Sequence, residues 1–146
     1  MFKNILVPYD GSEVSKRGLA NAVALAKSVG AKVTGFHVVP DINSTVRAYL
    51  PEAAYMPEDY SEKAAESGKQ VLKEIQQACQ SAGVECTTSY VVSEFVADEI
   101  VEAAKKNGCD LIAIASHGRT GLAKVMLGSQ TQKVLAHANI PVLVLR

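Results

Sequence analysis

Five short segments rich in apolar and β-branched residues are spread along the chain, and each predicts a β-strand. They cover residues 5–7, 32–39, 86–92, 111–115 and 142–145. Leu111–Ala115 is the most apolar of the five, so we place it at the centre of a sheet, where both faces of a strand are buried.

Four further segments carry apolar residues at helical spacing between these strands. The first follows a cap at Asp10 or Ser12 and stops at Gly30, the second covers residues 61–82 with Ser61 as its cap, the third covers residues 95–106, and the fourth begins near Gly128. We expect the inward faces to hold Leu19, Ala22, Val23, Leu25 and Ala26 in the first helix, Ala64, Val71, Leu72, Ile75 and Cys79 in the second, Phe95, Val96, Ile100, Val101 and Ala104 in the third, and Val134 and Leu135 in the fourth.

Alternation of apolar strands with helices indicates an α/β fold: a doubly wound parallel sheet with helices on both faces. We predict that residues 1–146 form a single domain of this class. Such sheets bind ligands beyond the carboxyl ends of their strands, where the strand order reverses. Residues 8–12, 38–40 and 115–118 fall at those ends. Residues 40–60, which contain three of the five prolines, predict either a functional lid or a partly disordered segment.

Composition narrows the class of protein. Fifteen Lys and Arg balance fifteen Asp and Glu, which argues against a nucleic acid as the main partner. No apolar run approaches the roughly 20 residues of a membrane span, so we expect no membrane insertion. The three cysteines form no C-x-x-C and indicate neither a disulfide framework nor a zinc site. The first residues lead directly into a strand without a signal peptide, and we expect a cytoplasmic protein.

A glycine-bearing loop after the central strand is the strongest candidate for chemistry. It contains Gly118 and Gly121, and Gly128-Ser129 opens the next helix. Glycine lets the backbone approach a ligand closely, and a helix start presents free N–H groups and a positive dipole end to an anion. Ser129 and Thr131 can add hydroxyl donors. The segment matches neither a Walker loop nor a dinucleotide fingerprint, so it predicts a phosphate site of another type.

Several segments, in order along the chain, resemble the universal stress protein family in its UspA-like, ATP-binding branch. They are Ile5-Leu6-Val7-Pro8-Tyr9-Asp10-Gly11-Ser12, Ala115-Ser116-His117-Gly118-Arg119-Thr120-Gly121, Leu127-Gly128-Ser129 and Ile140-Pro141-Val142-Leu143-Val144. The resemblance implies a five-stranded sheet of order 3-2-1-4-5, a homodimer, and bound ATP. The motif of that branch is G-x-x-G, nine residues, then G-[ST]. Gly118, the residues 119–127 and Gly128-Ser129 match it, whereas Ala115 replaces the first glycine.

The resemblance also implies roles for individual residues in binding ATP, or AMP or ADP at the same site. Asp10 and the backbone of Val38 would recognise the nucleoside, Pro8 and Ala115 would lie near the ribose, and Gly118, Gly128, Ser129, Gln130 and Thr131 would meet the phosphates. Arg119 can steer the polyphosphate, and Mg²⁺ or Mn²⁺ can bridge it. A methyl group at Ala115 is harmless if the backbone there has an ordinary φ.

Three alternatives remain open beside a nucleotide-binding stress regulator. A nucleotide-free interaction module of the same fold is favoured by Ala115, and a slow ATP hydrolase lacks an evident base. A Ser/His/Asp hydrolase built from Ser116, His117 and Asp10 lacks a G-x-S-x-G elbow. The last strand, Val142–Leu145, has no helix after it, so we expect this edge to pair in a homodimer. A regulatory protein partner is expected but its identity is not encoded in any motif.

Overall fold

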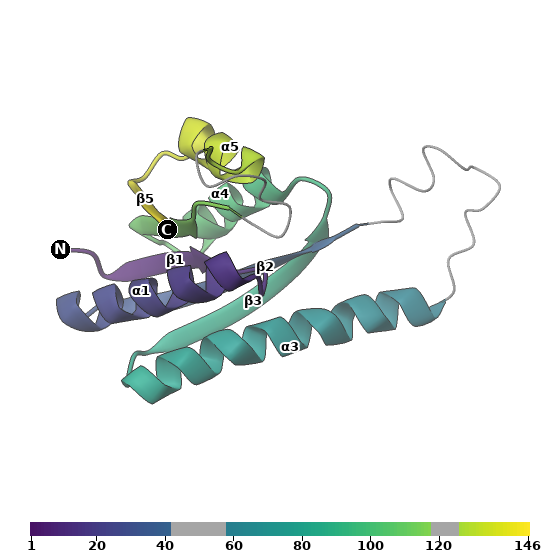
Figure 1. The fold of residues 1–146 in the computed structure, drawn as a ribbon, viewed down its shortest axis with the longest axis horizontal. Helices are drawn as coiled ribbons and strands as arrows, with labels where there is room; N and C mark the ends of the chain where they lie inside the picture. The colour runs from purple at the N-terminus through teal and green to yellow at the C-terminus, as the bar shows by residue number, and fades with distance from the viewer. Residues whose placement is uncertain (42–57, 118–125) are drawn as a thin grey trace.

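The computed structural model describes residues 1–41, 58–117 and 126–146 (Figure 1). Its five strands, all parallel to their neighbours, are β1 (Asn4–Pro8), β2 (Lys32–Pro40), β3 (Cys86–Ser93), β4 (Leu111–Ala115) and β5 (Val142–Leu145). They form one sheet in the order β3-β2-β1-β4-β5. The predicted fold class and strand order are confirmed.

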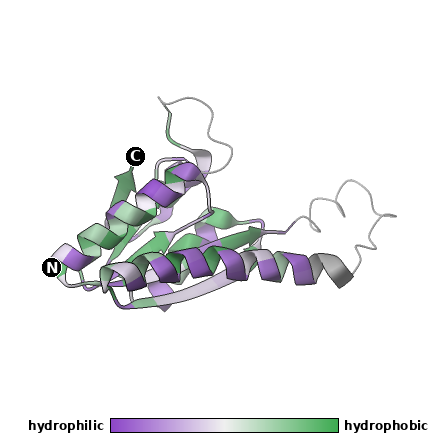
Figure 2. Cartoon of the chain, turned by 60° about the horizontal axis from the view of Figure 1, so that its bottom comes forward, coloured by the Kyte–Doolittle hydropathy of each residue, from purple (hydrophilic) through white to green (hydrophobic). Residues whose placement is uncertain are grey.

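Among the described residues, four helices cover the two faces of this sheet. They are α1 (Glu13–Val29), α3 (Glu58–Ala82), α4 (Val96–Lys106) and α5 (Ser129–His137). Figure 1 shows α1 and α3 on one face and α4 and α5 on the other. In Figure 2 the apolar sides of the helices turn toward the predominantly apolar strands. Within the described residues, no helix is both long and apolar enough to cross a membrane.

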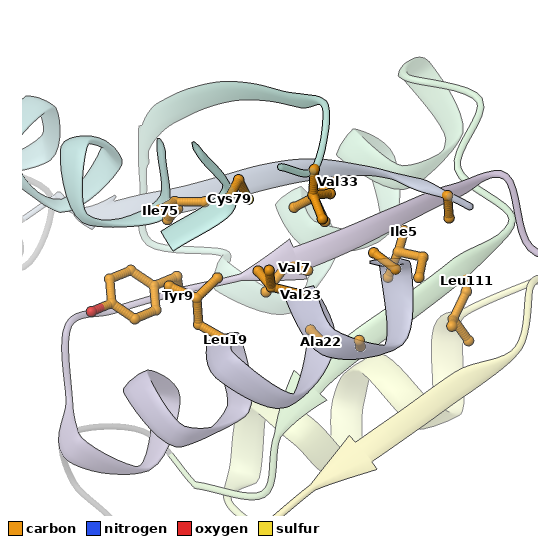
Figure 3. Packing of buried hydrophobic residues seen from close by; sticks show 14 of the residues in the cluster. Ile5, Val7, Tyr9, Leu19, Ala22, Val23, Val33, Ile75, Cys79 and Leu111 are labelled. Atoms are coloured by element: carbon orange, nitrogen blue, oxygen red, sulfur yellow. The ribbon is translucent and has the colours of Figure 1, made fainter. Parts of the chain in front are cut away.

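Alternation along the strands supplies one hydrophobic core on each face. In β1, Ile5 and Val7 pack with α1 and α3, whereas Leu6 packs with α4 and α5. Figure 3 shows the first core, where Val23 of α1 and Ile75 of α3 meet the strand residues. All of β4 is buried, as predicted, but it lies between β1 and the edge strand β5, and β1 is the middle strand of the sheet.

Local signals fix the ends of α1. The Ser12 hydroxyl accepts a hydrogen bond from the Ser15 N–H over 3.1 Å, so Ser12 rather than Asp10 caps the helix. At the other end Gly30 adopts a left-handed φ of 69°, which glycine tolerates without a steric penalty. The predicted stop is therefore confirmed.

Three details of the helix predictions are wrong. The helix α3 begins at Glu58, one turn before the expected cap at Ser61. Phe95 is 60% exposed because it is the residue before α4 and lies outside its apolar stripe. Leu135 is 42% exposed because the short helix α5 turns only Thr131 and Val134 fully inward. Most of the predicted lid, residues 42–57, lies outside the described residues.

A buried polar network closes the amino end of the sheet. The Asn4 side chain accepts a hydrogen bond from the Thr34 hydroxyl at 2.8 Å and donates one to the Asn107 carbonyl at 2.9 Å. The Asp110 carboxylate accepts the backbone N–H groups of Lys3 and Asn4. These bonds satisfy polar groups of β1 and β2 that burial would otherwise leave unpaired.

Helix α3 packs tightly against the sheet at Gly35. A Cβ atom added there would lie 2.6 Å from Cγ2 of Ile75, which is fully buried in α3. We therefore expect Gly35→Ala to lower the free energy of unfolding by about 1–3 kcal/mol through overpacking. Urea denaturation monitored by circular dichroism measures this loss.

A double-mutant cycle with Ile75→Ala tests whether the contact causes the loss. Ile75→Ala removes the atoms that the new methyl group would strike, so the penalty of Gly35→Ala should largely disappear in that background. Equal penalties in both backgrounds would contradict the assigned contact.

Candidate functional site

A cavity of about 840 Å³ opens at the carboxyl ends of β1, β2 and β4. Its volume lies in the range of small-molecule binding sites. The start of α5 forms one wall, and α4 contributes Val96 and Ile100. The cavity therefore lies where strand order reverses, as a doubly wound sheet predicts.

Most residues of the predicted nucleotide site line this cavity. Those among the described residues are Pro8, Asp10, Val38, Ala115, Gly128, Ser129, Gln130 and Thr131, and all eight are lining residues. Gly118 and Arg119 lie outside the described residues. Four separate segments of the sequence thus meet at one place in the fold.

No side chain among the described residues caps the first turn of α5. Gly128 is the N-cap residue, and its own N–H donates to the Ser116 carbonyl at 2.8 Å. The following N–H groups, of Ser129, Gln130 and Thr131, begin the helix at the cavity wall. Uncapped N–H groups at the positive end of a helix dipole form a suitable site for an anion.

Gly128 allows this helix start to approach the end of β4. A Cβ atom there would lie 3.3 Å from the Ser116 carbonyl oxygen and 3.4 Å from the His117 Cα atom. Its φ of −58° is ordinary, so close approach rather than a left-handed conformation makes glycine suitable.

Thr131 is 3% exposed, and its hydroxyl donates a hydrogen bond to the Ala115 carbonyl at 3.0 Å. The hydroxyl therefore donates its proton to the backbone of β4, whereas the sequence predicts that it donates to a ligand. The backbone N–H of Thr131 remains part of the first turn of α5. The side chain instead fixes α5 to the end of β4.

Ala115 is the position where the chain departs from the ATP-binding motif. It ends the extended strand β4, so its backbone has no need of glycine. Its methyl group lies on the α1 face of the sheet, where a Cβ at Gly18 would come within 3.3 Å of it. Gly18 makes room for this methyl group, and sequence reasoning missed the pairing because the two residues are far apart in the chain.

Asp10 organises the loop between β1 and α1. Its Oδ1 atom accepts the Ser12 N–H at 2.9 Å, and its own N–H donates to the Ser15 hydroxyl at 3.4 Å. The carboxylate thus forms a turn immediately before the helix cap and also lines the cavity. The structure places it where both interpretations of the residue, turn former and nucleoside acceptor, are geometrically compatible.

His37 fixes the end of β1 from the neighbouring strand. Its Nδ1 atom lies 2.8 Å from the Tyr9 carbonyl oxygen, and because that oxygen only accepts, Nδ1 carries the proton. The Tyr9 hydroxyl donates to the Glu74 carboxylate in α3. Burial and this hydrogen bond raise the pKa of Tyr9 well above its ordinary value, so the phenol stays neutral and is no candidate for a base.

The Ser/His/Asp arrangement is not assembled in the described part of the chain. Ser116 is 2% exposed, which hides its hydroxyl from a substrate. Its Oγ lies 2.9 Å from Nδ1 of His117, but Nε2 of that histidine is buried with no partner among the described residues. A general base needs a third group to orient it, and Asp10 does not hydrogen-bond to this ring.

The apolar wall of the cavity was missed as a functional feature. Phe36 and Ile114 line it from the sheet, and Val96 and Ile100 line it from α4. Sequence patterns assign such residues to the core, where they also belong. No periodicity distinguishes a core residue from one that also borders a ligand site.

Comparison with known proteins gives a consistent family. The universal stress protein family, Usp, matches residues 1–146. Universal stress protein MJ0531 of Methanocaldococcus jannaschii is 36% identical over 146 residues, covering 100% of this chain and 83% of its own. Universal stress protein YxiE of Bacillus subtilis is 34% identical over 150 residues and is covered completely, as is this chain.

Solved structures agree with the fold. The structure of MJ0577 from Methanocaldococcus jannaschii superposes with a TM-score of 0.82 at 29% identity, covering 99% of this chain and 96% of that one. A universal stress protein from Archaeoglobus fulgidus in complex with dAMP superposes with a TM-score of 0.64 at 23% sequence identity, covering 99% of this chain and 98% of that one. A universal stress protein family member from Arabidopsis thaliana with AMP bound superposes with a TM-score of 0.69 at 20% sequence identity, covering 98% of this chain and 90% of that one. Because the family model matches residues 1–146 and the fold agrees with solved members, this chain belongs to the universal stress protein family.

Proposed function

We propose that this chain is a cytoplasmic universal stress protein that binds ATP, or AMP or ADP, in the cavity at the carboxyl edge of its sheet. A regulatory protein partner would distinguish the nucleotide-bound form from the nucleotide-free form in a stress response. The observation that carries the proposal is the uncapped start of α5 forming a wall of a cavity that Asp10 and Val38 also line.

The residues present fit an adenine nucleotide. Phe36, Val38 and Ile114 give the apolar surface that a base requires, and the α5 start gives N–H donors for phosphate. His117 Nε2, buried and unpartnered among the described residues, is a further polar atom beside that wall. Mg²⁺ or Mn²⁺ would be held by the nucleotide phosphates and would neutralise part of their charge.

Nucleotide complexes of family members support the choice of ligand. The Archaeoglobus fulgidus protein holds dAMP and the Arabidopsis thaliana protein holds AMP. The accommodation of Ala115 against Gly18 weakens the reason for preferring a nucleotide-free module. Slow hydrolysis finds no support in the described residues, where no carboxylate orients His117.

We also propose a homodimer formed through β5. This strand is the sheet edge next to β4, and Leu143 is 37% exposed. The Ile112 N–H donates to the Pro141 carbonyl and the Ser116 N–H to that of Leu145. Alternation along the strand then directs the backbone groups of Val142 and Val144 away from β4, available to a second copy.

Ser129→Glu tests the phosphate end of the site. A carboxylate at the α5 start favours the helix dipole but repels a phosphate placed there. We expect ATP affinity to fall by roughly tenfold or more while adenosine affinity changes little, both measured by isothermal titration calorimetry.

Asn139→Asp is the matched control, because it adds one negative charge at an exposed residue outside the cavity. It should leave ATP affinity within about twofold of the unmodified protein. Equal losses in both variants, or full ATP affinity in Ser129→Glu, would contradict the assigned phosphate position.

Asp10→Asn tests the nucleoside end. The asparagine oxygen can still accept the Ser12 N–H and preserve the turn, whereas the negative acceptor is lost. We expect affinity for adenosine, AMP and ATP to fall by a similar factor of about tenfold to a hundredfold, as for a lost hydrogen bond to a charged group. Unchanged adenosine binding with an intact melting temperature would assign Asp10 to the turn alone.

Val144→Pro tests the dimer. Proline removes a backbone N–H that points away from β4, so the fold should persist while pairing with a second copy is blocked. Light scattering at micromolar concentration should give a dimer for the unmodified chain and for Val144→Thr, and a monomer for Val144→Pro. A monomeric unmodified chain would overturn the dimer proposal.

A further inference from the structure

Two cysteines flank the turn that joins α3 to β3. Cys79 lies in the last turns of α3 and Cys86 is the first residue of β3. Between them Gly83 adopts a left-handed φ of 71°, and the Val84 N–H donates to the Cys79 carbonyl at 2.9 Å. The turn therefore folds the strand back against the helix that precedes it.

Both side chains point into the core between the sheet and α3. Cys79 is fully buried there, beside Ile75 and Val33 (Figure 3). Cys86 is the register partner of Val33 on the adjacent strand, so its side chain lies on the same face and packs against this core. Cys86 is only partly buried, since β3 is the edge of the sheet.

The two thiols are not equivalent, and the Cys86 thiol donates to the Thr87 carbonyl at 3.7 Å. The nearby Cys79 thiol lowers the pKa of Cys86, burial opposes this effect, and the Gly35 backbone N–H adds to the lowering. The neighbouring Cys86 thiol, together with burial, raises the pKa of Cys79. Cys86 is thus the partly exposed thiol that ionises first, and Cys79 is the buried thiol beside it.

We propose that Cys86 and Cys79 are a reversible oxidation site that forms an intramolecular disulfide in response to hydrogen peroxide. This site lies on the opposite face of the sheet from the α4 wall of the cavity and is independent of nucleotide binding. Its closure ties the carboxyl end of α3 to the edge strand β3. A dithiol reductant reverses it.

The chemistry has two steps. The Cys86 thiolate attacks one peroxide oxygen, an S–O bond forms, the O–O bond breaks, and hydroxide leaves. The Cys79 sulfur then attacks Cys86 as its proton is lost, the S–O bond breaks, and the departing hydroxide takes that proton to give water. Peroxide is reduced and the two sulfurs are oxidised by one electron each.

Cys109 provides an internal control within the same chain. It is buried against the α4 and α5 core, and burial raises its pKa. Neither of the other cysteines belongs to that core. Peroxide should therefore oxidise Cys109 at least about tenfold more slowly than Cys86.

The experiment uses the reduced full-length protein treated with hydrogen peroxide, quenched with N-ethylmaleimide under denaturing conditions, and analysed by mass spectrometry. Trypsin cuts after Lys73 and Lys105, so both cysteines fall on one peptide, which should lose two hydrogen atoms and gain no maleimide. A protease that cuts after glutamate separates them at Glu85, and the two fragments should remain joined until a reductant is added.

Two variants separate the roles of the thiols. Cys79→Ser should leave Cys86 reactive but give a sulfenic acid that dimedone traps, with no joined fragments. Cys86→Ser should slow the oxidation of Cys79 by about tenfold or more, because the remaining thiol is buried and protonated. Dithiothreitol should restore both thiols in the unmodified protein.

Three outcomes would overturn the proposal, and each is visible in the unmodified protein even if a variant fails to fold. Oxidation of Cys109 at the rate of Cys86 would show no selectivity. Disulfides between chains on a non-reducing gel, in place of the joined fragments, would show that Cys79 does not close the pair. Recovery of both thiols as maleimide adducts after peroxide would show that the site is inert.

Discussion

The arrangement of this protein depends on burying both faces of its central strands, β1 and β4. Every residue from Leu111 to Ser116 is buried, and Ile5, Leu6 and Val7 are almost completely removed from water. Strands of this kind exclude water only when helices cover both sides of the sheet. The pairs α1 with α3 and α4 with α5 provide that cover, and each adds its own hydrophobic core. Polar groups are consequently directed to the two ends of the strands.

The polar groups at the two ends of the sheet find hydrogen-bond partners in different ways. At the amino end, Asn4 and Asp110 satisfy the backbone and the Thr34 hydroxyl with side-chain hydrogen bonds, and the end is closed. At the carboxyl end, the Ser116 carbonyl accepts the N–H of Gly128, and no side chain in the described part of the chain caps the helix that begins there. One end therefore uses its polar groups internally, whereas the other presents backbone donors beside a cavity. This asymmetry is the physical basis of the proposed nucleotide site.

Sequence patterns predicted the elements and their order in the chain because strands buried on both faces and glycine stops leave strong signals. They failed for Phe95 and Leu135, since an apolar residue at an element boundary or on a short helix carries no mark of which way it points. The cavity position followed from the fold class, but the roles of Asp10 and Gly128 followed from a resemblance, with spacing alone indicating only an anion site. The hydroxyl bond of Thr131 to Ala115 depends on tertiary contact and has no local signature. Gly118 and Arg119 remain predictions.

Ala115 shows why a motif has to be read through the packing around it. In isolation, a methyl group in place of glycine suggests a loss of close approach to a ligand. The side chains of β4 alternate, and Ala115 shares the α1 face with Leu111 and Ala113, where Gly18 leaves space for it. Its carbonyl meanwhile accepts the Thr131 hydroxyl and so holds α5 in place. The substitution therefore changes the packing between β4 and α1, while the backbone contact between Ser116 and Gly128 that positions the helix start is left intact.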